Sequence, residues 1–237
     1  MKGVILAGGK GTRLLPFTKF TNKHLLPIGR KPMILYPLET LKRSGIRKVL
    51  IVADGKFLSQ FKTLLGSGKS LGMQISFVVQ RQASGIAGAL RLAEEFAGND
   101  DIAVVLGDNI FEDNFASAVK SFQSGARVFL KRVPDPERFG VAELRGSRVH
   151  RIIEKPKYPK SDLAVVGLYF YDANVFDAIR GQKPSRRGEL EITDVNNWYQ
   201  QKDQLDARKV KGFWSDAGTL ASLARATELV RGLNKNT

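Results

Sequence analysis

Short apolar runs alternate with amphipathic stretches along the first half of the chain. The run at 3–7 ends in two glycines, which is typical of a buried strand that leads into a loop. The next stretch, 32–44, has apolar residues at helical spacing, a proline near its start and a glycine just past its end. Four strands that alternate with helices in about a hundred residues predict a mostly parallel sheet covered by helices on both faces. The further elements expected here are strands at 49–53, 75–79 and 102–106 and helices at 57–65 and 86–96.

The pattern changes after residue 125, where strands follow one another with few helices between them. Arg145-Gly146-Ser147 predicts a hairpin turn between two of these strands. Because no linker rich in proline, glycine or serine divides the chain, we expect one α/β domain over 1–237. Its halves, 1–125 and 126–237, would share one Rossmann-like mixed sheet. The elements expected in the second half are strands at 127–133, 141–144, 149–154, 165–171 and 205–209 and helices at 190–201 and 220–231.

The composition is that of a soluble globular protein, and it removes several kinds of chemistry. Hydrophobic residues make up 43% of the chain and charged residues 26%, which excludes a disordered or coiled-coil protein. The chain has no cysteine, so it has no disulfide, cysteine–zinc site or thiol nucleophile, and two histidines are too few for a histidine-rich metal site. No apolar run approaches the ~18 residues of a membrane span, and the run 4–7 is too short for a signal peptide. We therefore expect a cytoplasmic protein that does not bind membranes.

Positive charge is concentrated near the start of the chain. The net charge is +15, and the first 60 residues hold twelve basic and two acidic side chains, which is +10. Such a field attracts anions. Charge alone does not distinguish a nucleic acid from a small polyphosphate.

The strongest motif is the loop Gly8-Gly9-Lys10-Gly11-Thr12-Arg13-Leu14, which follows the first expected strand. Its glycines let backbone N–H groups approach phosphate oxygens, and Arg13 can hold a phosphate through two hydrogen bonds. Leu14 stands where the dinucleotide fingerprint needs its third glycine, so the loop is not that motif. The alternative interpretation is a tight turn with no ligand, but three glycines and two cations in six residues favour phosphate binding.

Two acidic residues are candidate metal ligands. Asp108 follows the expected strand at 102–106, and ligands of such sheets bind beyond the carboxyl ends of the strands. Mg²⁺ in proteins usually takes one or two carboxylates together with substrate phosphates and water. Asp216 is the best second carboxylate, although its place just before a helix suits a helix cap equally well.

Three further sites carry weaker signals. Glu154 and Lys155 place an acid and a base side by side at a strand end, where one of them can face a cleft. Lys23, taken alone, fits an ordinary surface lysine, and His24, without a nearby partner, fits a structural residue. In the strand at 165–171, a glycine at 167 would let a ligand approach the backbone.

Together these motifs resemble those of the sugar-phosphate nucleotidyltransferases, above all the branch that acts on glucose 1-phosphate. They occur in the family's order over nearly the whole chain, and seven motifs in register are far more specific than one. The matching segments are 8–14, 23–27, 31–34, 106–109, 154–156, 167–171 and 188–194.

The resemblance implies an enzyme that transfers the nucleotidyl group of dTTP to glucose 1-phosphate and releases pyrophosphate. The sugar phosphate would attack the α-phosphorus directly, with Mg²⁺ held by Asp108 and Asp216, and 1–125 would bind the nucleotide and 126–237 the sugar phosphate. The implied catalytic residues are Arg13, Lys23 and Lys155. The implied nucleotide-binding residues are Leu6, Gly8, Gly9, Gly11, Thr12, Gln80 and Gly85. The implied sugar-phosphate-binding residues are Gly140, Glu154, Lys155, Val166 and Tyr169.

The partners implied are small molecules only, a pyrimidine nucleoside triphosphate and a sugar 1-phosphate. Ser84 stands where the family commonly has an acidic residue, and Gly88 where it commonly has glutamine or glutamate. The choice between dTTP and UTP therefore stays open, and UDP-glucose synthesis, or use of both nucleotides, is the alternative. The family branch adds helices after the segment at 220–231, so feedback control and a homo-oligomer also stay open.

Two other classes of function compete with this one. A non-catalytic sensor of nucleotide sugars would be expected if a catalytic position were lost, but Arg13, Asp108, Lys155 and Asp216 are all present. A nucleic-acid binder rests on charge alone, because the basic residues are not interleaved with aromatic ones. We therefore expect no nucleic-acid partner.

Overall fold

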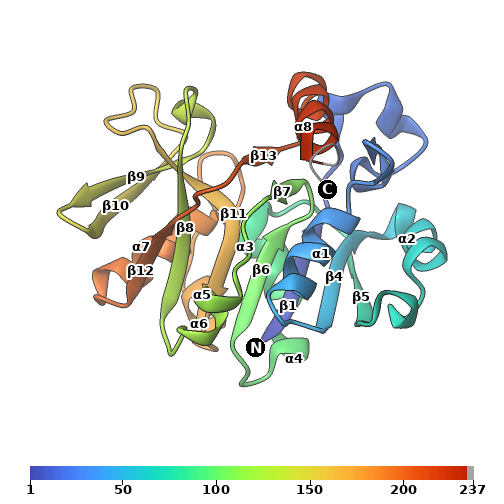
Figure 1. Ribbon diagram of the computed structural model, residues 1–237. Helices are drawn as coiled ribbons and strands as arrows, with labels where there is room; N and C mark the ends of the chain where they lie inside the picture. Colours follow the sequence, from blue (N-terminus) through green and yellow to red (C-terminus); the bar gives the residue numbers. More distant parts are fainter. Residues whose placement is uncertain (234–237) are drawn as a thin grey trace.

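The computed structural model describes residues 1–233, and a nine-stranded sheet forms their centre (Figure 1). Its main path runs β10-β9-β11-β6-β1-β4-β5, and β8 pairs with both β11 and β12. The four first-half strands are parallel to one another, as the alternation of strands and helices predicts. Their bounds are β1 Lys2–Ala7, β4 Lys48–Asp54, β5 Gln74–Gln80 and β6 Ile102–Leu106.

The second half extends the same sheet, mostly with antiparallel strands. Strand β11 pairs antiparallel with β6, so the sheet continues from one half of the chain into the other. The turn at Gly146 joins β9 to β10 as an antiparallel hairpin, and β12 pairs parallel with β8. The mixed α/β sheet expected from the sequence is thus confirmed. The strands are β8 Ala126–Arg132, β9 Gly140–Arg145, β10 Arg148–Glu154, β11 Leu163–Tyr171 and β12 Leu205–Lys209.

Helices cover both faces of the sheet. On one face, α1 (Leu35–Arg43) and α2 (Leu58–Leu65) pack against Ile5, Ile51 and Val105, together with α5 (Ala116–Lys120). The helices on the other face are α3 Gly85–Arg91, α4 Glu94–Ala97, α6 Val175–Arg180 and α7 Ile192–Gln201. The single helix expected at 86–96 is wrong: the helix breaks at Leu92–Ala93, and α4 is a separate short turn of helix. The helices α5 and α6 were not predicted.

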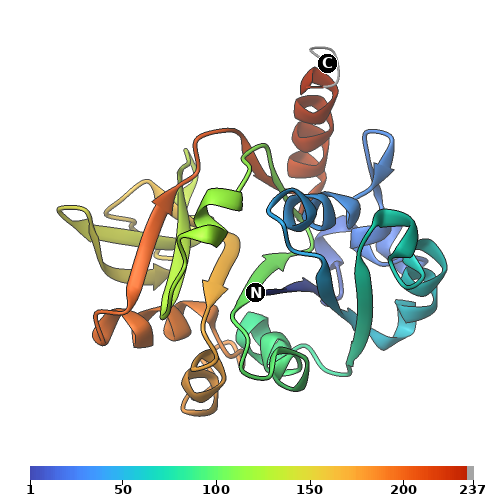
Figure 2. The same cartoon turned by 60° about the horizontal axis from the view of Figure 1, so that its bottom comes forward.

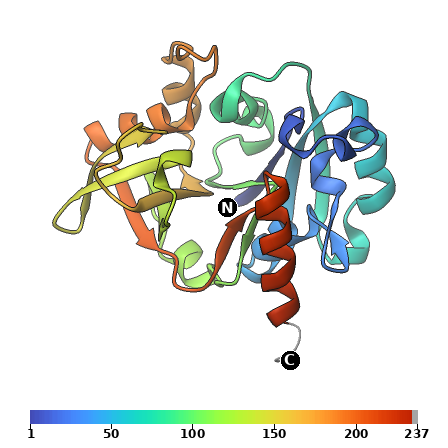
Figure 3. The same cartoon turned by 90° about the horizontal axis from the view of Figure 1, so that it is seen from above.

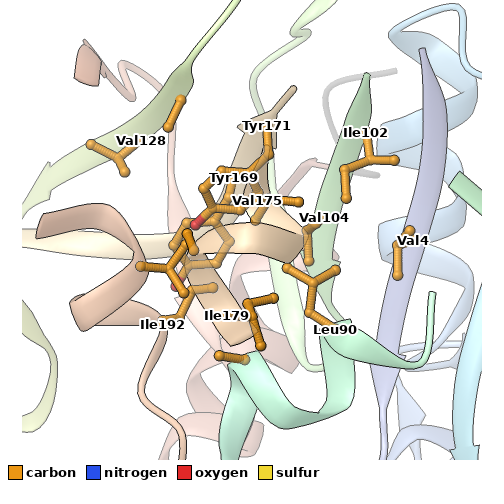
Figure 4. Packing of buried hydrophobic residues seen from close by; sticks show 14 of the residues in the cluster. Val4, Leu90, Ile102, Val104, Val128, Tyr169, Tyr171, Val175, Ile179 and Ile192 are labelled. Atoms are coloured by element: carbon orange, nitrogen blue, oxygen red, sulfur yellow. The ribbon is translucent and has the colours of Figure 1, made fainter. Parts of the chain in front are cut away.

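The largest hydrophobic cluster lies between the sheet and α3, α6 and α7 (Figure 4). Tyr169 and Tyr171 of β11 stack with their ring centroids 6.0 Å apart, and Tyr171 also stacks on Tyr199 of α7. The Tyr171 hydroxyl donates to Asn196 at 2.6 Å, so its polar end is satisfied inside the core. Tyr169 is 3% exposed, and this core therefore ends directly beneath the functional cleft described below.

A small two-stranded ribbon and the last helix complete the fold. The ribbon pairs β7 (Asn109–Phe111) antiparallel with β13 (Trp214–Asp216). Helix α8 (Leu220–Leu233) projects from the body of the molecule (Figure 2), and its buried Ala226 and Val230 pack in one cluster with first-half residues near β2 (Pro27–Ile28) and β3 (Lys31–Pro32). No helix within residues 1–233 is long and apolar enough to cross a membrane.

Candidate active site

A cleft runs along the carboxyl ends of the parallel strands, and both halves of the chain line it. In Figure 3 the halves lie side by side, with the first-half strands to the right. The first half contributes residues that follow β1, β5 and β6, and the second half contributes residues from β9, β10, β11 and the start of α7. The predicted site residues that line the cleft are Leu6, Gly8, Gly9, Arg13, Lys23, Gln80, Gly85, Asp108, Gly140, Glu154, Lys155, Tyr169 and Asp216.

At the end of the cleft where the resemblance predicts the nucleotide, the backbone of Gly8 lies directly against the side chain of Gln80. A Cβ built on Gly8 would come within 1.9 Å of Gln80 Oε1, so only glycine leaves room for this amide. Gln80 is the last residue of β5 and is 8% exposed, and Gly85 begins α3 beside it with a positive φ of 82°. An amide and an exposed backbone edge can together form directional hydrogen bonds to a planar base.

The glycine loop places Arg13 in the cleft. Gly11 has a positive φ of 61°, and its carbonyl accepts hydrogen bonds from Thr18 Oγ1 and from the Leu14 amide. Leu14 is fully buried and anchors the short 3-10 turn Thr12–Leu14. Gly11 and Thr12 shape this turn rather than line the cleft, so their predicted contact with the nucleotide stays a prediction.

The two candidate metal ligands are held together by the β7–β13 ribbon. Asp108 immediately precedes β7, and Asp216 ends β13 opposite Asn109. The amide of Ala217 donates to the Asp108 carbonyl at 2.8 Å. Backbone hydrogen bonds therefore set the relative position of two carboxylates that lie far apart in the sequence.

Gly218 leaves an open space between these carboxylates. A Cβ at Gly218 would lie 3.5 Å from Asp108 Oδ2, 3.5 Å from Asp216 Oδ2 and 3.3 Å from Arg13 Nη2. No cluster of three or more histidine or acidic ligands occurs in residues 1–233, so the donor set here is two carboxylates. Two hard oxygen ligands beside an arginine suit Mg²⁺, which completes its shell with phosphates and water.

Each carboxylate is paired with a cation in this structure. Lys23 Nζ lies 2.5 Å from Asp108 Oδ2, and Arg138 Nη2 donates to Asp216 Oδ2 at 2.9 Å. Burial tends to raise the pKa of Asp108, but the Lys23 ammonium outweighs it and holds this pKa well below its usual range. For Asp216, burial prevails over the nearby Arg138 and raises the pKa. The two carboxylates therefore differ in acidity although they face the same space.

The end of the cleft where the resemblance predicts the sugar phosphate contains Glu154, the last residue of β10, and Lys155, which follows it. Glu154 accepts a hydrogen bond from Thr193 Oγ1 at 2.6 Å and lies 3.4 Å from Arg187 Nη2. Lys155 has a positive φ of 42°, which is strained for a non-glycine residue, and its amide donates to the Phe139 carbonyl at 3.0 Å. Such strain is frequent where a side chain must be aimed at a ligand.

The predicted contact of Val166 with the sugar phosphate stays a prediction. Its side chain is fully buried in the core on the opposite face of the sheet, with Ile5 and Val105, while the neighbouring Val165 lines the cleft. Successive side chains of a strand point to opposite faces, so any contact of Val166 with a ligand would be made by its backbone.

His24 is buried beside the cleft and is uncharged. Its Nδ1 lies 2.7 Å from Asn22 Oδ1, and its ring packs against Gly107. Burial, with a further contribution from the Lys23 charge, lowers its pKa to about 3. This environment agrees with the structural role expected from the sequence.

Three residues of the site were not assigned a role from the sequence. Arg138 and Trp214 line the end of the cleft near Asp216, and Trp214 Nε1 donates to Asn109 Oδ1 at 2.7 Å. Arg187 lies beside Lys155 and binds both carboxylate oxygens of Glu191. Arg138 lies two residues before Gly140, Trp214 two residues before Asp216, and Arg187 directly before the segment 188–194, so each stands next to a position that the sequence analysis names.

The α/β fold and the cleft with two carboxylates facing a glycine–arginine loop suit the binding of a phosphate together with a divalent cation. Residues 2–232 match the nucleotidyl transferase family, and the chain belongs to this family.

Several relatives carry one particular name. A glucose-1-phosphate thymidylyltransferase from Neisseria meningitidis is 47% identical over 98% of this chain and 83% of its own length. The enzyme of the same name from Mycolicibacterium smegmatis is 42% identical over 98% of this chain and 82% of its own. A crystal structure from Bacillus anthracis, assigned as a glucose-1-phosphate thymidylyltransferase in complex with sucrose, has a TM-score of 0.94 and 50% identity over 98% of this chain and 95% of that one. The structure of a UDP-glucose pyrophosphorylase with UDP-glucose has a TM-score of 0.85 at 26% identity, over 98% of both chains.

Proposed function

We propose that this protein transfers the thymidylyl group of dTTP to glucose 1-phosphate, giving dTDP-glucose and pyrophosphate. One observation carries the proposal: Asp108, Asp216 and Arg13 surround a single open space between the two ends of one cleft. The names of the relatives that share 42–47% of the sequence over nearly the whole chain support the choice of substrates.

The reaction needs no protein nucleophile. An oxygen of the sugar phosphate attacks the α-phosphorus, the bond from that phosphorus to the bridging oxygen breaks, and pyrophosphate leaves with the electron pair. Arg13 and Lys23 hold the triphosphate and neutralise charge on the departing pyrophosphate. Positioning two anionic reactants in line can lower the barrier by ~7–11 kcal/mol.

The acceptor is held by second-half residues. Lys155 and Arg187 bind the phosphate of the sugar phosphate, and Glu154, Gly140 and Tyr169 bind the sugar. Mg²⁺, held by Asp108 and Asp216, would stabilise the charge that develops on the transferred phosphoryl group. Lys23 and Arg138 pair with Asp108 and Asp216 in this structure, and they would be free to turn toward phosphate oxygens if these carboxylates held the ion.

The base is read at Gln80 and Gly85, which lie side by side in the cleft. Thymine and uracil differ by one methyl group, which a pocket distinguishes by only ~1–3 kcal/mol. UDP-glucose synthesis is therefore the second candidate function, and the likeness to a UDP-glucose pyrophosphorylase favours it. We further propose that 1–237 acts as one domain in the cytoplasm on small-molecule substrates.

The test is pyrophosphate release from glucose 1-phosphate with each nucleoside triphosphate in turn. We expect release with dTTP, slower release with UTP and none when the metal is chelated. An Asp108→Asn variant should lose turnover far more than dTTP binding, because the carboxylate acts on the metal and not on the base. No release from wild-type protein with any pyrimidine nucleotide would reject both candidate reactions, and binding without turnover would favour the sensor.

A further inference from the structure

A strap formed by residues 185–191 connects the two ends of the cleft. It belongs to the second half of the chain, but its last part pairs with the loop that begins α3 in the first half. The amide of Leu190 donates to the Ser84 carbonyl at 2.9 Å, and the amide of Ala87 donates to the Leu190 carbonyl at 3.1 Å. These two hydrogen bonds join the proposed base-reading loop to the strap.

The other part of the strap carries the charged groups of the sugar-phosphate end. Glu191 is 8% exposed, and its carboxylate accepts hydrogen bonds from Ser185 Oγ at 2.7 Å and from Arg187 Nη2 at 2.8 and 2.9 Å. The same Arg187 nitrogen lies 3.4 Å from Glu154. A shift of the strap would therefore move Arg187 relative to the acceptor site.

Two glycines make the pairing possible. A Cβ on Gly85 would lie 2.5 Å from the Leu190 carbonyl oxygen and 2.9 Å from its nitrogen, so the strap can approach only a glycine. A Cβ on Gly88 would lie 2.2 Å from Ser84 Oγ and 2.7 Å from Ser84 Cβ. Ser84 thus occupies the space that a side chain at residue 88 would fill.

Ser84 and Gly88 have no direct part in the cleft. The cleft is lined near them by Ala83, Gly85, Ile86 and Ala89. The Ser84 side chain makes no capping hydrogen bond to helix α3, so its carbonyl is the group that matters here. A change confined to this pair can therefore alter the pairing with Leu190 without removing a group that faces a ligand.

We propose that Gly88 and Ser84 are positioning residues whose close fit keeps the base loop paired with the strap, and that this pairing holds Arg187 at the acceptor phosphate. The proposal rests on the proposed function for the identity of that acceptor. Ser84 and Gly88 lie in the first half of the chain, yet by this proposal they affect the affinity for the sugar phosphate.

The test compares Gly88→Ala with the double variant Ser84→Gly/Gly88→Ala. The added methyl group of Gly88→Ala displaces Ser84, and we expect the KM for glucose 1-phosphate to rise about tenfold, since overpacking of this kind commonly has effects of that size. The Kd for dTTP, measured by calorimetry without the sugar phosphate, should change less than about twofold. The double variant removes both clashing atoms and refills the space of the Ser84 side chain, so its KM should return to near the wild-type value. Ser84→Gly alone empties that space, so its KM for glucose 1-phosphate should also rise.

Hydrogen exchange gives a readout that does not depend on turnover. The Leu190 and Ala87 amides should exchange faster in Gly88→Ala and recover in the double variant. An unchanged KM for the sugar phosphate in Gly88→Ala, or an equal rise in the Kd for dTTP, would overturn the proposal. If the wild-type protein released no pyrophosphate at all, the proposed reaction would fail, and direct calorimetric binding of glucose 1-phosphate to the same variants would still decide whether the strap is coupled to the base loop.

Discussion

Replacing Gly218 by alanine tests where the metal and the polyphosphate lie. The new methyl carbon would lie 3.5 Å from one oxygen of each candidate metal ligand and 3.3 Å from the Arg13 guanidinium. These are contacts that a folded protein accepts with small adjustments, and the φ of Gly218 is outside the left-handed region. The free energy of unfolding should therefore change by less than about 0.5 kcal/mol.

The functional cost should be much larger. Mg²⁺ binds its oxygen ligands at about 2.0–2.1 Å, so a methyl group in contact with both carboxylates occupies one side of the space that the ion and its phosphate oxygen need. A displacement of the reacting groups by about 1 Å can reduce the rate about 100-fold. We expect a loss of kcat of that order in Gly218→Ala.

Three measurements separate this effect from a folding defect. Pyrophosphate release gives kcat, Mn²⁺ binding followed by electron paramagnetic resonance reports the metal site directly, and urea unfolding gives stability. Gly181→Ala is the matched control, because a Cβ there meets only ordinary contacts at 3.7 and 3.9 Å, at the end of α6. Wild-type turnover and unchanged Mn²⁺ affinity in Gly218→Ala would refute the placement of the metal between Asp108 and Asp216.

Three further predictions concern other parts of the molecule. Burial lowers the pKa of His24 to about 3, against 6.5 in the unfolded chain, so the free energy of unfolding is highest above pH 6.5 and falls as the pH drops toward 3. Between pH 7 and 5, urea unfolding should show a loss of about 2 kcal/mol. His24→Gln should abolish this contribution to the pH dependence of stability. Arg187→Lys loses the second donor, Nε, that binds Glu191 beside Nη2, so the KM for glucose 1-phosphate should rise about tenfold in steady-state assays while dTTP binding is kept. Val230→Ala removes two buried methyl groups from the contact of α8, and chemical denaturation should show a loss of about 1–2 kcal/mol.

The parallel half of the fold could be predicted because burial on both faces produces continuous apolar runs. The strand at 102–106 was expected with the bounds that the structure shows. The helix expected at 86–96 failed because Leu90, Ala93 and Ala97 are all buried on one side, so the apolar spacing continues through the break. The ribbon strands β7 and β13 have three residues each, so they are too short to show the alternation of apolar and polar residues that identifies a strand.

The candidate site could be predicted where a residue follows a strand or lies in a glycine loop, as Asp108 and Arg13 do. Arg138 could not be predicted, because its contact with Asp216 joins residues 78 positions apart and exists only in the folded protein. Val166 is expected in the site from the resemblance alone, because the strand is buried throughout and the sequence has no polar alternation that shows which face lines the cleft.

The β7–β13 ribbon has a consequence for how proteins of this architecture can change. Asp108 and Asp216 are joined by backbone hydrogen bonds across the ribbon, while the chain between them, 112–213, forms most of the half that we propose binds the acceptor. Insertions, deletions and substitutions in that long excursion can reshape the acceptor pocket while the ribbon preserves the spacing of the two carboxylates. Evolution can thus exchange the sugar that is recognised and retain the chemistry of the transfer.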